Sequence, residues 1–489
     1  MKSLFRPVTA ALLLLCGLVA PATAQTGSSE TTRETSASLS TLSAGGIAAG
    51  LGAGSPLLGG VPSGTLQSGV VRLTLHDALN RGLAHNLAAV VSAQRVRSAD
   101  AVRWSAQSGL LPTVSATLAQ AKEQINLQAF GIPVAPGESP IVGPFTVSDR
   151  RFSVEQTLFS YSAIESARSG SAVKAAAGYA HQDVRDQVVV VIAGLYLQIV
   201  STQSRVEAAR AQLGTATALY DRAVAMKQAG MAAGVETIRA QVQVENQRQR
   251  VIYFENEVAK QKLQLARAIG MPLAQPFELA DRFPYASIGD MAPDEAIARA
   301  MATRADYKSL AAQLKAAEFS RQAAIGSLLP TLNLAADVGN IGPQWGSALR
   351  TFSLVAAVHI PIFQAGRERS RILAADALLE QERAQLADLR VRIEYDVRAA
   401  LLNVDAADRL VRVAKGASDL AALQLAQAQD RFGAGVTSHL EVVQAQESVA
   451  TASDNLIASQ FSHSLAKGAL ARALGIAEAS VERFLGGQQ

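Results

Sequence analysis

The chain has 489 residues, of which 49% are apolar and 18% charged, and its formal net charge is +4. This composition excludes a disordered chain, because it supplies enough apolar surface for a large core. The charge is nearly balanced and no concentrated basic patch is present, which argues against a protein that binds nucleic acid.

Residues 1–24 are predicted to form a secretory signal peptide. Lys2 and Arg6 make its start positive, an apolar core follows, and Ala-Thr-Ala at 22–24 is a small-residue cleavage site. The only cysteine, Cys16, follows three leucines in this leader, whereas lipid attachment requires small residues there. We therefore expect an exported chain without disulfide bonds. After the leader we find no run of about 18 apolar residues, so we expect no membrane-spanning helix.

Residues 25–70 are rich in Ser, Thr, Gly and Ala, which predicts a flexible N-terminal segment. Its clustered glycines lack the strand and helix that flank a nucleotide-binding loop, so we do not interpret them as one.

The remainder reads as two similar halves, 71–275 and 276–489. The matching segments are LLP at 110–112 and 328–330, GMAAGVETIRAQ at 230–241 and GVTSHLEVVQAQ at 435–446, and ARAIG at 266–270 and ARALG at 471–475. Each half has the same predicted order: a helix that ends at LLP, two strands, a very long helix, a glycine-containing turn and another helix.

Apolar and polar residues alternate in two segments of each half, which predicts strands with one apolar face. Each segment has close to the ~9–11 residues of a tilted transmembrane strand. The predicted strands lie near 113–128, 147–161, 331–340 and 351–363.

The long helices have a different period. Between Val188 and Ala216, and again between Leu386 and Val411, apolar residues recur every three or four positions, which is the spacing of a coiled-coil seam. The helix predicted from Ala163 to Gln228 would be roughly 100 Å long at ~1.5 Å per residue. That length suits a tube that crosses a compartment.

Four strands are too few to close a barrel, since small barrels need about eight. An open sheet with an apolar face would leave unpaired edge groups in lipid. The chain is therefore expected to oligomerise, and three copies would give a plausible twelve-stranded barrel.

The leader, the duplicated halves, the order of elements and the glycine turns followed by Ala-Gln resemble the TolC family of outer membrane efflux proteins. The resemblance covers about residues 71–476 and implies a mainly α fold with a small transmembrane β part. It implies a homotrimer whose twelve-stranded β-barrel continues into a periplasmic α-helical barrel. It also implies a passive exit duct, in the outer membrane, of a tripartite efflux pump or type I secretion system. The implied partners are a periplasmic adaptor and an inner-membrane transporter.

By this resemblance the two glycine turns are the periplasmic tips that contact the adaptor. The alternative is that they are only turns that end helices. The residues assigned to the tips are Gly230, Met231, Ala232, Gly435, Val436 and Thr437.

The family has two acidic residues at the constriction just after the second tip, and they match Glu441 and Gln444 here. Three copies of Glu441 would form a ring that attracts cations, although Gln444 removes half of the usual charge. Alternatively, Glu441 is an ordinary carboxylate near a helix N-terminus. Glu236 is its counterpart in the first half, and Arg239 either pairs with a carboxylate or is solvated.

A periplasmic coiled-coil adaptor or structural protein is the main alternative, but two equivalent halves with a strand pair in each favour the duct. The six histidines are scattered without metal-ligand spacing, and no Gly-x-Ser-x-Gly or nucleotide motif is present, so we expect neither an enzyme nor a cofactor. The residues that could belong to aromatic girdles of a barrel, or to ordinary strand packing, are Trp345, Phe352, Phe130 and Phe145.

Overall fold

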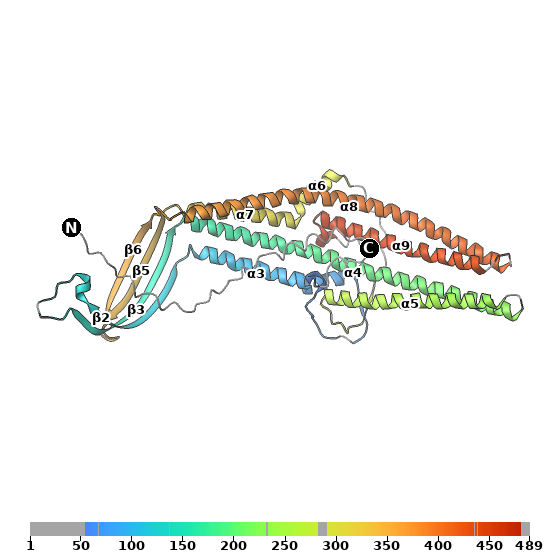
Figure 1. Ribbon diagram of the computed structural model, residues 1–489, viewed down its shortest axis with the longest axis horizontal. Coiled ribbons are helices and arrows are strands. Elements are labelled where there is room, and N and C mark those ends of the chain that lie inside the picture. Colours follow the sequence, from blue (N-terminus) through green and yellow to red (C-terminus); the bar gives the residue numbers. More distant parts are fainter. Residues whose placement is uncertain are drawn as a thin grey trace, which may run out of the picture.

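The computed structural model describes residues 54–480, except 67, 136, 231–232, 282–290, 435 and 438. The predicted signal peptide and most of the predicted N-terminal segment lie outside the described residues. The molecule is elongated, with strands at one end and two helical hairpins at the other (Figure 1).

The four long strands form one antiparallel sheet. They are β2 (Thr113–Asn126), β3 (Ile141–Phe159), β5 (Thr331–Gly342) and β6 (Leu349–His359). Their order is β2-β3-β5-β6, so β2 and β6 are the two edges. A strand therefore occurs in each of the four segments where alternation predicted one, and the two hairpins lie side by side (Figure 1).

The start of β3 differs from the prediction near residue 147. Gly143 and Pro144 resemble a loop in sequence, but they lie at a β-bulge, where the register shifts between Glu123 and Ile125. A bulge accommodates residues that do not fit a regular ladder, and the strand continues past it to Ile141.

In each half of the chain, two helices precede the β-hairpin in sequence and two helices follow it. They are α2 (Leu75–His85), α3 (Leu87–Ser108), α4 (Tyr161–Gln228) and α5 (Gly234–Ala268), then α6 (Pro293–Thr303), α7 (Ala305–Gly326), α8 (Arg367–Gly433) and α9 (His439–Ala473). With 68 and 67 residues, α4 and α8 are each about 100 Å long at 1.5 Å per residue. They form hairpins with α5 and α9 (Figure 1).

The main core lies midway along the molecule, where α4 is packed on several sides. Val188, Val191 and Ile192 of α4 are fully buried with apolar residues of α2 and α5. Gly82 of α2 permits this packing, because a Cβ atom there would lie 1.8 Å from the Cδ1 atom of Ile192. Two short parallel strands, β1 (Val71–Leu73) and β4 (Phe277–Leu279), complete this region and were not predicted.

Among the described residues, only α4 is long and apolar enough to cross a membrane by composition. This segment did not stand out in the sequence, because only an uninterrupted apolar run was sought there. However, 83% of its apolar stretch is buried inside the protein, so the hydropathy of α4 reflects its place in the core.

A network of partly buried charges connects the two halves in the same region. Arg304, before α7, contacts the carboxylate of Asp306 at 2.6 Å and that of Asp396 in α8 at 3.1 Å. Nearby, Arg472 of α9 pairs with Asp183 of α4. Burial raises the pKa of Asp183, which is nearly enclosed. The network holds α4, α7, α8 and α9 in a fixed relative position.

Candidate functional site

The first hairpin tip is the turn between α4 and α5. Gly230 has φ of +72°, in the left-handed region that glycine adopts without a Cβ penalty. The N–H groups of Ala229 and Gly230 donate hydrogen bonds to the carbonyl groups of Ala225 and Lys227. The predicted tip residues Met231 and Ala232 lie outside the described residues.

The second tip is the turn between α8 and α9. The N–H group of Val436 donates a 3.0 Å hydrogen bond to the carbonyl group of Arg431, and the Val436 side chain is exposed. Thr437 is half-buried. The predicted tip residue Gly435 lies outside the described residues. Both predicted tips are thus turns at the end of the molecule farthest from the sheet (Figure 1).

Glu441 is held by two groups of its own tip. Its Oε1 atom lies 2.8 Å from Nη1 of Arg431, the last basic residue of α8, and its Oε2 atom accepts a hydrogen bond from the Thr437 hydroxyl group. It also lies in the first turn of α9, where a carboxylate is favoured by the helix dipole. Its charge is therefore partly compensated within the chain, and its side chain bridges the tip.

Gln444 lies one turn farther along α9 and is exposed. It lines an open groove between α8 and α9, of about 650 Å³, together with Leu420, Gln424 and Glu447. Residues three apart are neighbours on a helix surface, so Glu441 and Gln444 lie on adjacent parts of the same side of α9.

The corresponding residues of the first tip pair with each other. Nη1 of Arg239 lies 3.0 Å from Oε1 of Glu236 on the same face of α5. Of the two predicted alternatives for Arg239, the structure thus contains the carboxylate pair, but within one helix rather than across the tip. Because Arg239 is largely exposed and Glu236 partly exposed, this pair contributes little to stability.

The two tips also contact each other through residues that sequence analysis missed. Leu219 near the end of α4 packs with Ala428 of α8 and Val442 of α9 in a small apolar cluster. The guanidinium carbon of Arg222 lies 5.5 Å from the ring centroid of Phe432, a cation–π contact between the hairpins. The sequence feature that could have indicated this contact is Phe432, an aromatic residue directly before the second turn.

The sheet presents an apolar face to its surroundings. Val114, Leu118, Phe152, Phe352 and Leu354 are exposed large apolar side chains, and they belong to the same alternation on their strands. The opposite face carries ionic groups, among them Arg151, which pairs with both Asp149 and Asp337. An apolar outer face with a polar inner face is typical of a strand in a membrane barrel.

The predicted aromatic residues lie in different settings. Phe352 belongs to the apolar face and is 80% exposed, whereas Phe145 is half-buried. Phe130 is exposed in the short 3-10 helix Leu127–Phe130, and Trp345 lies in the β5–β6 connection against Arg150.

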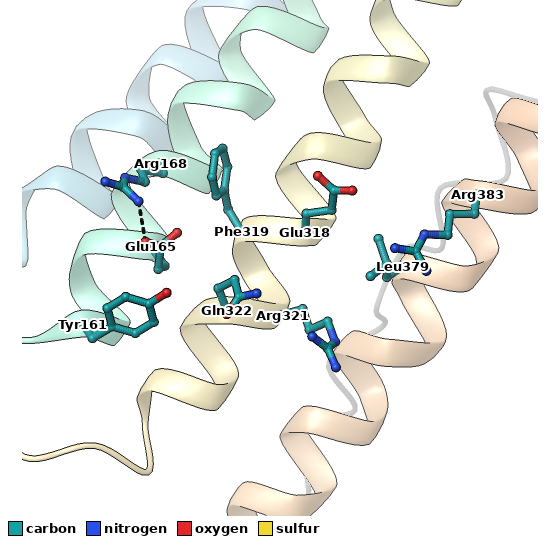
Figure 2. A pocket seen from close by; sticks show the side chains of 9 residues that line it. All are labelled: Tyr161, Glu165, Arg168, Glu318, Phe319, Arg321, Gln322, Leu379 and Arg383. Atoms are coloured by element: carbon teal, nitrogen blue, oxygen red, sulfur yellow. Dashed lines mark hydrogen bonds and ion pairs between the residues drawn. The ribbon is translucent and has the colours of Figure 1, made fainter.

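A second groove, of about 420 Å³, lies where α4, α7 and α8 approach the sheet. Figure 2 shows Glu165 and Arg168 paired on one side of it, at 2.6 Å, and Arg383 of α8 on the other. The groove is open and mixes both charges. In the part of the chain that the structure describes, no group of three or more His, Cys, Asp or Glu side chains could hold a metal ion.

Comparisons with known proteins show what the chain is similar to. Residues 296–476 match the model of the outer membrane efflux protein family. The chain is 26% identical to the pyoverdine export outer membrane protein OpmQ of Pseudomonas aeruginosa over 414 residues, which is 82% of this chain and 85% of that protein. It is 28% identical to OpmQ of Pseudomonas putida, over 81% of this chain and 84% of the relative. Over most of its length the chain is therefore similar to outer membrane efflux proteins.

The crystal structure of the outer membrane protein VceC from Vibrio cholerae has the same fold. Its TM-score is 0.71 at 17% identity, over 82% of this chain and 96% of that chain. By its resemblance to outer membrane efflux proteins, this chain is an outer-membrane transport protein with a large periplasmic portion, rather than an enzyme. The comparisons favour a channel over a periplasmic adaptor as the interpretation of this chain.

Proposed function

We propose that three copies of this chain form the exit duct of a tripartite efflux pump or type I secretion system. The observation that supports this most strongly is the open sheet. Its edges, β2 and β6, leave backbone groups unpaired, and its apolar face is exposed. In lipid such groups require partners, which the edges of neighbouring copies supply. Three four-stranded sheets make a twelve-stranded barrel.

Exposed apolar stripes on the helices support the same assembly. One group of exposed apolar residues occurs along α8 and another along α5, and these helices lie on opposite sides of the two hairpins (Figure 1). The residues of α8 recur over many turns, which is more than scattered surface residues produce, whereas those of α5 fall in two groups. The stripe of α8 contains Val391, Tyr395, Leu402, Leu410, Val413 and Leu420, and that of α5 contains Ile238, Val242 and Ile252. In the proposed trimer, α8 of one copy packs against α5 of the next and closes a helical barrel.

Each part of the chain then has a place in the duct. We propose residues 71–275 and 276–489 as the two efflux repeats, with 1–24 as the removed signal peptide and 25–70 as a flexible segment. The tips at 230–232 and 435–437 dock to a periplasmic adaptor, which connects the duct to an inner-membrane transporter. The transporter supplies the energy, and the duct is passive.

The constriction is proposed at the same end. Three Glu441 side chains would surround the narrowest point, each held by its Arg431 and Thr437. Gln444 would line the wall one turn above, with Glu236 and Arg239 of the first tip between the Glu441 positions. Because Arg431 compensates part of each carboxylate, the ring would be a modest cation filter that opens when the tips separate.

Cysteine cross-linking between the two sheet edges tests the trimer. Ser115→Cys in β2 is combined in turn with Thr351→Cys, Ser353→Cys or Val355→Cys in β6, all on the polar face. We expect one combination to give covalent trimers in outer membranes.

The control replaces Ser115→Cys with Ser153→Cys. Ser153 lies in β3, whose two sides are already occupied by β2 and β5, so it should give no cross-link between chains. If no edge combination links chains, or if the Ser153 pairs link equally well, the barrel closure proposed here is wrong.

A further inference from the structure

Two arginines lie in one row across the apolar face of the sheet. Side chains alternate along a strand, so Arg150 lies on the same face as Phe152, and Arg350 on the same face as Phe352. Arg150 pairs in register with Asn340, which in turn pairs with Arg350. The phenylalanines form the next row toward the helices. The apolar face is therefore bordered by cations where β5 and β6 end, on the side away from the helices, while β2 and β3 continue beyond this row.

Lys122 of β2 extends this border, because it shares the alternation of Leu118, the register partner of Arg150. We call Lys122, Arg150 and Arg350 the cationic rim. All three are exposed, and within the described part of the chain none of them forms an ion pair with a carboxylate.

The apolar face has no acidic residue to balance the rim. The strands contain four carboxylates, and by alternation all of them fall on the opposite face. Two of these are already paired there with Arg151. The four carboxylates are Glu123, Asp149, Glu155 and Asp337. The outward face thus carries three positive charges and no negative charge, all at one end of the apolar band.

Trp345 fixes the position of one rim cation. Nη2 of Arg150 donates a 3.0 Å hydrogen bond to the carbonyl group of Trp345, and its guanidinium carbon lies 5.8 Å from the centroid of the indole ring. Tryptophan prefers the boundary between the acyl chains and the head groups of a membrane. The pair therefore places the rim at head-group depth and leaves Arg150 directed at whatever lies there.

We propose that the cationic rim binds the phosphate group of a lipid head group in the outer leaflet. This rests on the proposed barrel, in which the helices are periplasmic and the rim faces lipid at the outward end. Arginine and lysine bind phosphate oxygens by charge-assisted hydrogen bonds, and their long side chains reach the head groups from the edge of the apolar band. Each copy supplies one such site, and bound lipid neutralises cations that would otherwise border the acyl chains uncompensated.

The chain offers its own reporter, because it contains two tryptophans, Trp104 and Trp345. In a Trp104→Phe background, the mature full-length protein is reconstituted into phosphatidylcholine vesicles that contain a small fraction of brominated lipid. Bromine on the acyl chains quenches tryptophan fluorescence on contact. We expect brominated phosphatidylglycerol to quench Trp345 about threefold more than the same fraction of brominated phosphatidylcholine, because each rim cation favours an anionic lipid.

The test variant is Lys122→Gln/Arg350→Gln, which keeps the contact between Arg150 and Trp345. It should lose more than half of the excess quenching by phosphatidylglycerol, and Lys122→Arg/Arg350→Lys should keep it. The matched control is Arg95→Gln/Arg97→Gln, which removes two exposed cations of α3 and should leave the excess unchanged. If the double variant does not assemble as heat-modifiable trimers, Arg350→Gln alone is used.

The possible results separate the two proposals. If both brominated lipids quench Trp345 equally, or the excess survives in Lys122→Gln/Arg350→Gln, the lipid site is wrong while the barrel stands. If neither lipid quenches Trp345, the barrel itself is wrong. If inorganic phosphate removes the excess and chloride at equal ionic strength does not, the rim is an ion site and not a lipid site.

Discussion

The helices α4 and α8 have almost the same length and the same position in their halves of the chain, yet their surroundings differ. A continuous stretch of α4, from Asp186 to Leu197, is buried, because α2, α3, α5, α7 and α9 all pack around this helix. Buried residues of α8 recur only along one side, and Leu402 and Leu410 on another side are exposed. Because α4 and α8 have similar lengths but α8 is much less buried, α8 lacks a neighbour in the single chain. In our proposal that neighbour is another copy.

A charge in the enclosed part of α4 should have the largest effect on the protein. Ile192 is fully buried against Gly82, so Ile192→Asp places a carboxylate without a partner in the core. Burial of an unpaired charge costs several kcal/mol, and we expect little or no folded protein in the outer membrane. Ile192→Val, which removes one methylene group, should cost only about 1 kcal/mol and preserve the trimer. Normal amounts of Ile192→Asp in outer-membrane fractions would contradict the assigned core.

The same charge on the exposed stripe of α8 should spare the fold and prevent assembly. Leu402 is 70% exposed, so Leu402→Asp loses little burial within one chain but places a carboxylate in the proposed contact between copies. We expect a native helical content by circular dichroism and a loss of trimers on semi-native gels. Asn403→Asp, on the adjacent exposed position, adds the same charge and should assemble normally. If Leu402→Asp still forms intact trimers, the exposed side of α8 does not contact another copy, and the proposed assembly loses this support.

The charge network between the halves should contribute a smaller, pH-dependent stabilisation. Burial of Asp306 favours its neutral form, but the hydrogen bonds and charge of Arg304 prevail and lower the pKa of Asp306 below 3.8. A lowered pKa in the folded state stabilises the protein above the unfolded value, and this contribution disappears as the pH falls through the folded value. Asp306→Asn should therefore lower the melting temperature by a few degrees at pH 7. The difference from the parent protein should vanish near pH 2, as thermal unfolding in detergent would show.

A pH-independent difference would indicate that Asp306 acts by packing and not by its charge. Asn340→Asp would not serve as a control, because it adds a charge in the sheet, away from the network, instead of removing one. The suitable control is Asp405→Asn, whose carboxylate pairs with Arg409 on the surface of α8 and should change the melting temperature very little.

The smallest effect concerns the tips. Glu441→Gln should leave folding and assembly intact and reduce the cation selectivity and divalent-ion block of the reconstituted pore. The reduction should be modest, because Arg431 already compensates part of the charge. Glu236→Gln removes the counterpart in the first tip, which Arg239 holds on α5, and should change selectivity less. Single-channel conductance in mixed salts measures the selectivity of both variants. Unchanged selectivity in Glu441→Gln would contradict the proposal that Glu441 forms the constriction ring.

The tips show which features of the site could be predicted from the sequence and which could not. The turns could be located from glycine, and Glu441 could be placed beyond the second turn by its match to the family. Its contacts with Arg431 and Thr437 could not be predicted, because they depend on the path of the chain through the turn. The contact of Arg222 with Phe432 joins hairpins about two hundred residues apart in sequence, and no local period reports such a distance.

The sequence by itself determined the long elements of this protein: which segments form the four-stranded sheet and which form the long helices. These properties follow from periods of two and about three and a half residues, which local backbone geometry imposes. Only the tertiary structure decided which face of each element is covered. The burial of α4, the exposure of α8 and the cations at the outer end of the sheet arise from neighbours distant in sequence, because packing depends on what the whole chain brings together.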